Sequence, residues 1–193
     1  MLVITSTTTL VPDNPAAAYA AYRQAASAVF LAGTQGLKYK KDHYDLAVDL
    51  SKAGLTYIDE RADEIVIGAM TPLWQIKISQ AIQNFAGGAI SKAISDVADK
   101  NIQRYGTLGG VISSKAPFSV LLPILLSLHV DVQLQDKGCM SLDDYLHCPP
   151  MGELVTGISI AKEAVYTAYK AYRKLPVDEP YLVGAVAMRD DSW

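Results

Sequence analysis

The chain has 193 residues, of which 50% are hydrophobic and 19% charged, and its formal net charge is −3. Its 17 basic residues are scattered, with the densest cluster at Lys38, Lys40 and Lys41, so the sequence lacks the basic face typical of DNA and RNA binders. The charged fraction is below the about 25% of ordinary globular domains, which indicates that a partner or further copies of the chain cover part of the surface.

The N-terminal residues predict an extended arm followed by a helix. Residues 2–11 are rich in β-branched types, which favour an extended segment or edge strand within an arm over 1–12. Asn14 and Pro15 form a helix start, with Asn14 as the cap. This helix carries the sequence AYAAYR, with Tyr19 and Tyr22 on one face, and we expect it to end near Gly33 and Gly36.

The middle of the chain is also expected to be mostly helical. Apolar residues at helical spacing predict one bent helix or two antiparallel helices over 37–69. Pro72 opens a further helical region that reaches Tyr105, and Gly87–Gly88 marks a hinge, a turn or a close helix contact within it.

From residue 117 onwards the pattern changes. The apolar run 116–130 is too short to span a membrane and contains Pro123, so it is interpreted as a core segment. Strict alternation over 128–135 predicts a half-buried strand. Ser141 opens a short acidic helix that Pro149 and Pro150 end.

The most regular pattern lies near the C-terminus, over residues 154–175. Apolar residues recur there at alternating spacings of four and three, which predicts a heptad seam on one long helix. The seam consists of Leu154, Ile158, Ala161, Val165, Ala168, Tyr172 and Leu175. Its segment AYKAYR nearly repeats AYAAYR, so the helix carrying Tyr19 and Tyr22 is expected to face it, in the same subunit or the next.

Together these patterns predict a mainly α fold, a helical bundle of five or more helices with a minor antiparallel β element. The strand candidates lie near 2–11, 128–135 and 181–188. The expected organisation is an extended arm over 1–12, a helical domain over 13–175 with a β insertion near 128–135, and an extended tail over 176–193.

Candidate chemical sites are sparse. Cys139, His147 and Cys148 have metal-ligand chemistry but not the paired spacings of a zinc site, and no known nucleophile motif surrounds either cysteine. The acidic pairs Asp143–Asp144, Asp59–Glu60 and Asp63–Glu64 are explained by a helix N-terminus or an exposed helix face. The glycines of YGTLGG and FAGG match neither a P-loop nor a dinucleotide fingerprint, and are interpreted as turns or close packing.

The sequence thus predicts no catalytic, cofactor-binding or metal-binding residue, no cofactor, and a protein that is not an enzyme. The favoured function is a structural subunit of a homo-oligomeric assembly, such as a capsid-internal, connector or tail protein of a virion, with copies of itself and other assembly proteins as partners. Two alternatives stay open: a membrane-active protein that releases 116–130, and a small enzyme that uses Cys139 or Cys148 with His129 or His147.

The start of the sequence bears on localisation. The residues MLVITSTTTL lack the basic start and long apolar core of a secretory signal peptide. We therefore expect a protein that is cytoplasmic or incorporated into a virion or other large assembly, and not secreted by a classical signal peptide. Nucleic acid and membrane contacts are both disfavoured.

Overall fold

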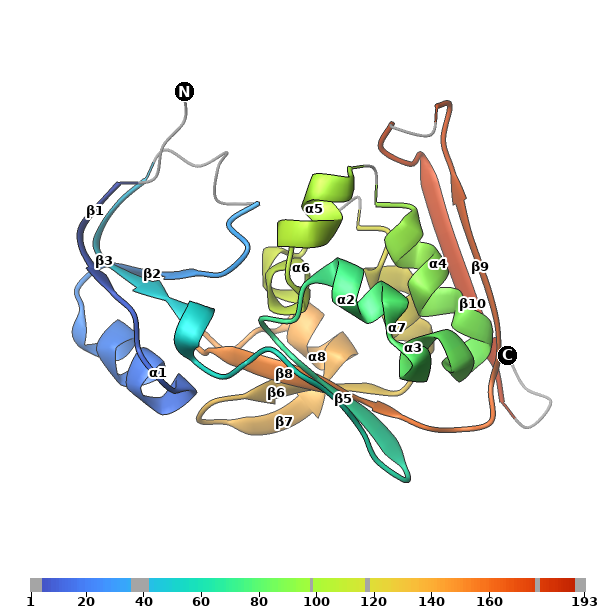
Figure 1. Cartoon of the computed structure of the whole chain (residues 1–193), viewed down its shortest axis with the longest axis horizontal. Coiled ribbons are helices and arrows are strands. Elements are labelled where there is room, and N and C mark those ends of the chain that lie inside the picture. Colours follow the sequence, from blue (N-terminus) through green and yellow to red (C-terminus); the bar gives the residue numbers. More distant parts are fainter. Residues whose placement is uncertain (1–4, 36–41, 98, 117–118, 176–177, 190–193) are drawn as a thin grey trace.

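The computed structural model describes residues 5–35, 42–97, 99–116, 119–175 and 178–189. Figure 1 shows a small N-terminal α/β unit, a central sheet beside a group of helices, and a β-hairpin at the opposite end. The fold is α+β, with 34% helix and 33% strand. The expected helical bundle is wrong, because 37–69 and 154–175, both predicted to be helical, contribute strands to these sheets.

The N-terminal unit is a parallel three-stranded sheet with one helix against it. Its elements are β1 (Thr5–Leu10), α1 (Pro15–Gln24), β2 (Ala28–Leu31) and β3 (His43–Asp49), and the strand order is β1-β3-β2. The predicted helix start is confirmed, since Oδ1 of Asn14 accepts a hydrogen bond from the Ala17 amide at 2.8 Å and Pro15 is the first helical residue. The helix ends at Gln24, well before Gly33, because the chain turns there into β2.

A five-stranded antiparallel sheet forms the centre of the molecule. Its strands, in spatial order, are β4 (Ile58–Glu60), β5 (Glu64–Gly68), β8 (Val155–Ala161), β6 (Val130–Leu134) and β7 (Gly138–Ser141). Ile67, Ile158 and Val132 lie in register across three of them, and each is at most 1% exposed. One sheet face therefore forms the floor of the main hydrophobic core.

Short helices cover that apolar face. They are α2 (Leu73–Ile78), α3 (Gln80–Asn84), α4 (Ala89–Ser95), α5 (Lys100–Tyr105), α6 (Leu108–Ser114) and α7 (Leu122–Ser127), while α8 (Leu142–His147) packs beside β6 and β7. Two 3-10 turns, Leu50–Lys52 and Phe85–Gly88, complete the set. Of the three alternatives for Gly87–Gly88, the structure shows a turn, because both residues have positive φ angles, +59° and +71°.

Two further strands form a separate hairpin. β9 (Tyr166–Tyr172) and β10 (Leu182–Met188) pair in antiparallel register from Tyr166 opposite Met188 to Tyr172 opposite Leu182. Tyr169 and Ala187 are buried against α4 and α7, so the hairpin closes the main core at its far end.

A second, smaller core cluster connects the N-terminal unit to the rest of the chain. It brings Ala18 of α1 and Val48 of β3 together with Leu55 and with Leu154, the residue before β8. The Tyr19 hydroxyl donates a hydrogen bond to Glu153 at 3.3 Å across the same boundary. Leu154, the first residue of the predicted seam, therefore lies beside α1, whereas the AYKAYR segment lies mostly in β9 and is absent from this cluster.

The predicted heptad helix is wrong, and local chemistry explains why. Its first half, VTGISIA, holds β-branched residues and a glycine, which favour a strand, and it becomes β8. The structure places the seam residues in different settings. Leu154 and Ile158 are buried, Ala161 and Val165 are half-buried, and Ala168, Tyr172 and Leu175 are exposed. Whether the exposed members contact another subunit stays a prediction.

The apolar run 116–130 supplies α7 and the start of β6. Leu121, Ile124, Leu125 and Leu128 are buried in the main core. Among the described residues, no helix combines the length and the apolar character needed to cross a membrane.

Candidate functional site

Two glycine-bearing segments that are far apart in sequence meet between the N-terminal unit and the helices. Residues 32–35 follow β2, and residues 105–110 connect α5 to α6. A Cβ atom on Gly33 would lie 1.9 Å from the carbonyl oxygen of Tyr105 and 3.1 Å from the Cα of Gly106. The two backbones therefore touch, and glycine is required at position 33. We call this contact the loop junction.

The backbone on the β2 side of the loop junction turns sharply. Thr34 has a positive φ of +55°, a conformation that costs free energy in a residue with a side chain and that is concentrated at functional sites. The Gln35 side chain donates a hydrogen bond to the Gly33 carbonyl at 3.2 Å, which stabilises the turn. Thr34 is exposed, so this turn lies at the protein surface.

The other side of the loop junction is held by α6. The Leu108 amide donates to the carbonyl of Thr71 and the Gly109 amide to that of Ala69, at 3.1 and 2.8 Å. A Cβ atom on Gly109 would lie 2.7 Å from that of Ala69, so a small residue is needed for this approach. Thr107 caps the helix by accepting from the Gly110 amide at 3.2 Å. The first turn of α6 is therefore rigid, with Gly110 exposed beside the junction.

A cavity of about 200 Å³ is lined by residues of α2, α5 and α6 and of the β9–β10 connection. We call it the interhelical cavity. A Cβ atom on Gly106, at the junction, would lie 3.5 Å from the Leu73 side chain. Leu73 also lines the cavity. Apolar side chains from α5, α6 and the residues before α7 form most of its wall, among them Ile102, Val111 and Val120. Ligand pockets in proteins are lined mainly by apolar side chains, as this cavity is.

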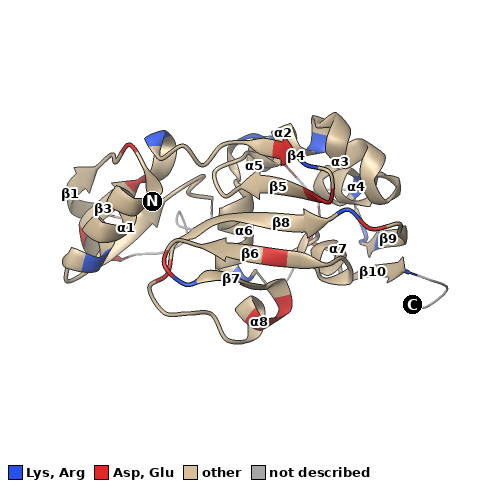
Figure 2. Ribbon diagram, turned by 90° about the horizontal axis from the view of Figure 1, so that it is seen from below, with Lys and Arg blue, Asp and Glu red and all other residues tan. Residues whose placement is uncertain are grey.

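A larger cavity of about 560 Å³ lies by the other face of the central sheet, and we call it the sheet-face cavity. Four of the residues that line it are acidic: Asp63, Glu64, Asp131 and Asp143. Figure 2 shows acidic residues in red on β6 and around α8. Four carboxylates repel phosphate groups, so this larger cavity disfavours an anionic ligand.

Glu163 lies in the connection between β8 and β9, and its side chain links this connection to residues next to β6 and β10, near the sheet-face cavity. One carboxylate oxygen is hydrogen-bonded to His129 before β6, and the other accepts from Nε of Arg189, after β10, at 2.8 Å. Arg189 also donates to the Ser127 carbonyl at 2.7 Å. The hydrogen bond from His129 and the Arg189 charge lower the pKa of Glu163, although partial burial acts in the opposite direction.

This lowered pKa predicts an acid-dependent loss of stability. A carboxyl group with a depressed folded-state pKa contributes stability above its ordinary value, 4.5, and loses it as the pH falls through the folded-state value. We expect wild type to be more stable than Glu163→Gln at about pH 5.5, and the difference to shrink at about pH 3.5. Urea unfolding at both pH values measures this difference in stability. A difference that grows on acidification would contradict the lowered pKa of Glu163. Water screening limits the size of the effect, because Glu163 is 38% exposed.

The candidates from the sequence are not brought together into a site. Cys139 and Cys148 are both exposed free thiols, and His147 contacts Asp143 of its own helix. Among the described residues, no group of three or more His, Cys, Asp or Glu side chains has metal-binding geometry.

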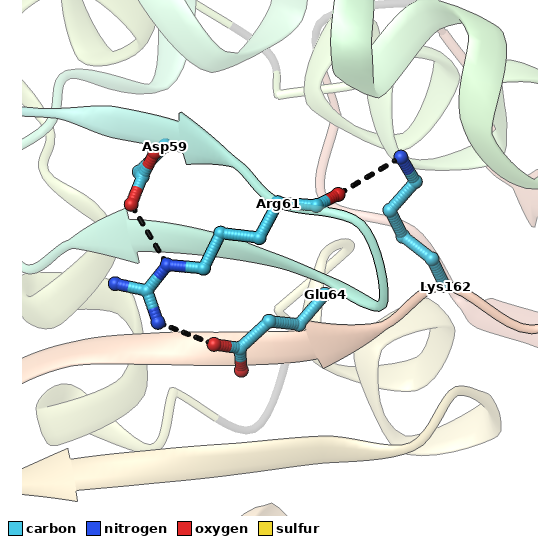
Figure 3. Close-up of polar contacts among 4 residues, drawn as sticks. All are labelled: Asp59, Arg61, Glu64 and Lys162. Atoms are coloured by element: carbon cyan, nitrogen blue, oxygen red, sulfur yellow. Dashed lines mark hydrogen bonds and ion pairs between the residues drawn. The ribbon is translucent and has the colours of Figure 1, made fainter.

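The acidic residues near 60 have a structural explanation, although they lie on a hairpin and not on a helix. Figure 3 shows Arg61 between Asp59 and Glu64, bonded to both, with Lys162 donating to the Arg61 carbonyl at 3.1 Å. Lys162 also pairs with Glu60 at 2.9 Å. These charges fasten the β4–β5 turn to the end of β8.

Family comparison is consistent with the loop junction as the functional region. Residues 5–162 match the model of the family described as FAD binding domain in molybdopterin dehydrogenase. The chain belongs to this family. The matched range includes both sides of the loop junction, and neither side was recognised in the sequence, because the glycines do not follow a P-loop or G-x-G-x-x-G pattern.

Relatives of this FAD-binding family resemble the chain in sequence and fold. The uncharacterized protein YgfM of Escherichia coli K12 is 28% identical over 165 residues, which cover 84% of this chain and 62% of that protein. Carbon monoxide dehydrogenase from Hydrogenophaga pseudoflava aligns with a TM-score of 0.85 at 22% identity, covering 94% of this chain and 69% of the other. Quinoline 2-oxidoreductase from Pseudomonas putida 86 has a TM-score of 0.83 at 18% identity, with 96% and 67% covered.

Membership of this family overturns the predicted function. A virion structural subunit that is not an enzyme, and both alternatives to it, conflict with membership of a family of FAD-binding domains in molybdopterin dehydrogenases. Composition and apolar spacing led to the wrong class because both describe how the chain packs and not what it binds.

Proposed function

We propose that this chain binds FAD, with the diphosphate at the loop junction and a ring system in the interhelical cavity, and so forms the flavin-binding part of a molybdopterin-containing oxidoreductase. The carrying observation is the backbone contact between Gly33 and Tyr105–Gly106, together with the approach of Gly106 to Leu73, which lines the interhelical cavity. The chain spans 62% of the length of the curated relatives, so the substrate and further subunits of the whole enzyme are outside this assignment.

The chemistry of the two regions fits the two ends of such a ligand. A diphosphate is held by main-chain N–H groups where no side chain blocks the approach, and the exposed turn at Thr34, next to Gly33, offers main chain of this kind. A flat aromatic ring is held by apolar walls that exclude water, which Leu73, Ile102 and Val111 supply.

In such an enzyme the bound flavin supplies electron transfer, while the protein binds, orients and shields it. The residues of this chain act through position. The rigid first turn of α6 fixes one wall of the site, since Thr107, Leu108 and Gly109 are all buried and hydrogen-bonded there. The packing of α1 and β3 against Leu55 and Leu154 holds the β2 side in place.

Titration of the flavin-free chain with FAD, followed by flavin fluorescence, tests the proposal. We expect one FAD per chain and weaker binding of FMN and of ADP, because each contains only part of the ligand. The variant Asp131→Asn, at the sheet-face cavity, should bind FAD as wild type does. Absence of FAD binding up to about 1 mM would overturn the proposal, and a changed affinity in Asp131→Asn would move the site to the other face.

A further inference from the structure

The β9–β10 hairpin is fastened by an arginine at each end. After β9, Nη1 of Arg173 donates a hydrogen bond to the main-chain carbonyl of Asp96, behind α4, at 2.8 Å. After β10, Arg189 bonds to Glu163 and to the Ser127 carbonyl. Both side chains are half-buried, so each combines a charge with a structural contact. They differ in what else they face.

Arg173 lines the interhelical cavity, whereas Arg189 lies by the opposite end of the hairpin. Among the described residues that line this cavity, Arg173 is the one cation, and the charged groups around it are the carboxylates of Asp96, Asp178 and Glu179. Three carboxylates make this wall unfavourable for phosphate and compatible with an uncharged ring. The charge distribution therefore supports the orientation in which the ring, not the diphosphate, occupies the cavity.

Tyr169, in β9, anchors this part of the hairpin in the main core. It is 5% exposed, and burial, with Asp96 beside it, raises the pKa of its hydroxyl far above the ordinary value, so it stays protonated. With Tyr169 buried against the core and Arg173 bonded to the carbonyl of Asp96, the guanidinium is held at the cavity wall rather than in solvent.

We propose that Arg173 is the residue by which this chain recognises the isoalloxazine ring of its cofactor. A guanidinium is planar and stacks on aromatic faces, and it donates to ring carbonyl oxygens such as those of isoalloxazine. The inference rests on the proposed function, since it assigns the contact that distinguishes the ring end of FAD from the adenine and diphosphate end.

The test compares FAD with ADP, which has the adenine and diphosphate but lacks the isoalloxazine ring. For Arg173→Ala we expect the dissociation constant of FAD to rise about tenfold, the order of one desolvated stacking contact, while that of ADP stays within a factor of two. Arg173→Lys keeps the charge but not the planar group, and should lie between wild type and Arg173→Ala.

Arg189→Ala is the matched control, because it removes the same side chain from the same hairpin without touching the cavity. Its FAD and ADP affinities should equal those of wild type. If Arg189→Ala weakens FAD as much as Arg173→Ala does, the effect comes from a loosened hairpin and the proposal fails. The proposal also fails if Arg173→Ala lowers the affinities for FAD and ADP equally, or if it lowers neither. Wild-type chain that binds neither ligand overturns the proposed function itself, which is a separate outcome.

Discussion

Replacement of Gly33 by alanine is expected to weaken FAD binding by about 100-fold, the order that a misplacement of about 1 Å costs at a preorganised site. A methyl group at this position would lie 1.9 Å from the Tyr105 carbonyl oxygen, far inside van der Waals contact. Since both partners are main chain, no side-chain rotation relieves the clash, and the segment after β2 must move away from α5 and α6. Fluorescence titration with FAD measures the loss.

The control for Gly33→Ala is Gly184→Ala in β10. A Cβ atom there has nothing within 4 Å and the residue is exposed, so the change should leave affinity and stability near those of wild type. Far-UV circular dichroism establishes whether Gly33→Ala is folded. A folded Gly33→Ala chain that binds FAD with wild-type affinity would show that the loop junction is not the cofactor region.

The second large effect is expected for Ile158→Ala in β8, which should lower the free energy of unfolding by about 3–4 kcal/mol. Ile158 is fully buried and packs in register between Ile67 and Val132 at the centre of the main core. Truncation removes its buried surface and leaves a cavity in a sheet that helices cover on this side. Urea unfolding gives the difference directly.

Tyr172→Ala is the informative comparison, because Ile158 and Tyr172 were assigned to the same helical seam. In the structure Tyr172 is 55% exposed at the end of β9, so its loss should cost less than about 1 kcal/mol, through its cross-strand neighbour Leu182. Equal and large losses for both variants would contradict the strand assignment of this region.

Local signals in the sequence located several elements correctly. Asn14 with Pro15 marks the start of α1. Ser141 marks the start of α8, where its hydroxyl accepts a hydrogen bond from the Asp144 amide at 3.0 Å. Alternation over 128–135 predicts a strand, and β6 lies within this range. These features depend on residues that are neighbours in the chain, where capping and side-chain period act directly.

Spacing alone failed where the chain has short strands. Over 154–175 apolar residues at intervals of three and four resemble a helix face, yet Val155, Thr156, Ile158 and Ile160 are β-branched and form β8. The same error over 37–69 hid β3, β4 and β5. Only Leu154 and Ile158 of the seven seam residues are buried, so the intervals of three and four do not trace one buried face, and β propensity is the better guide here.

By itself the sequence determined the start of α1, the break at Gly87–Gly88 and a strand within 128–135. Only the tertiary structure decided that Gly33 touches Tyr105, that α6 seals against Ala69 and Thr71, and that Arg173 lines the interhelical cavity. The reason is physical. A cap or an alternation is a local preference of a few residues, whereas this site consists of main-chain contacts between segments about 70 residues apart, whose closeness is set by how the sheets and helices pack.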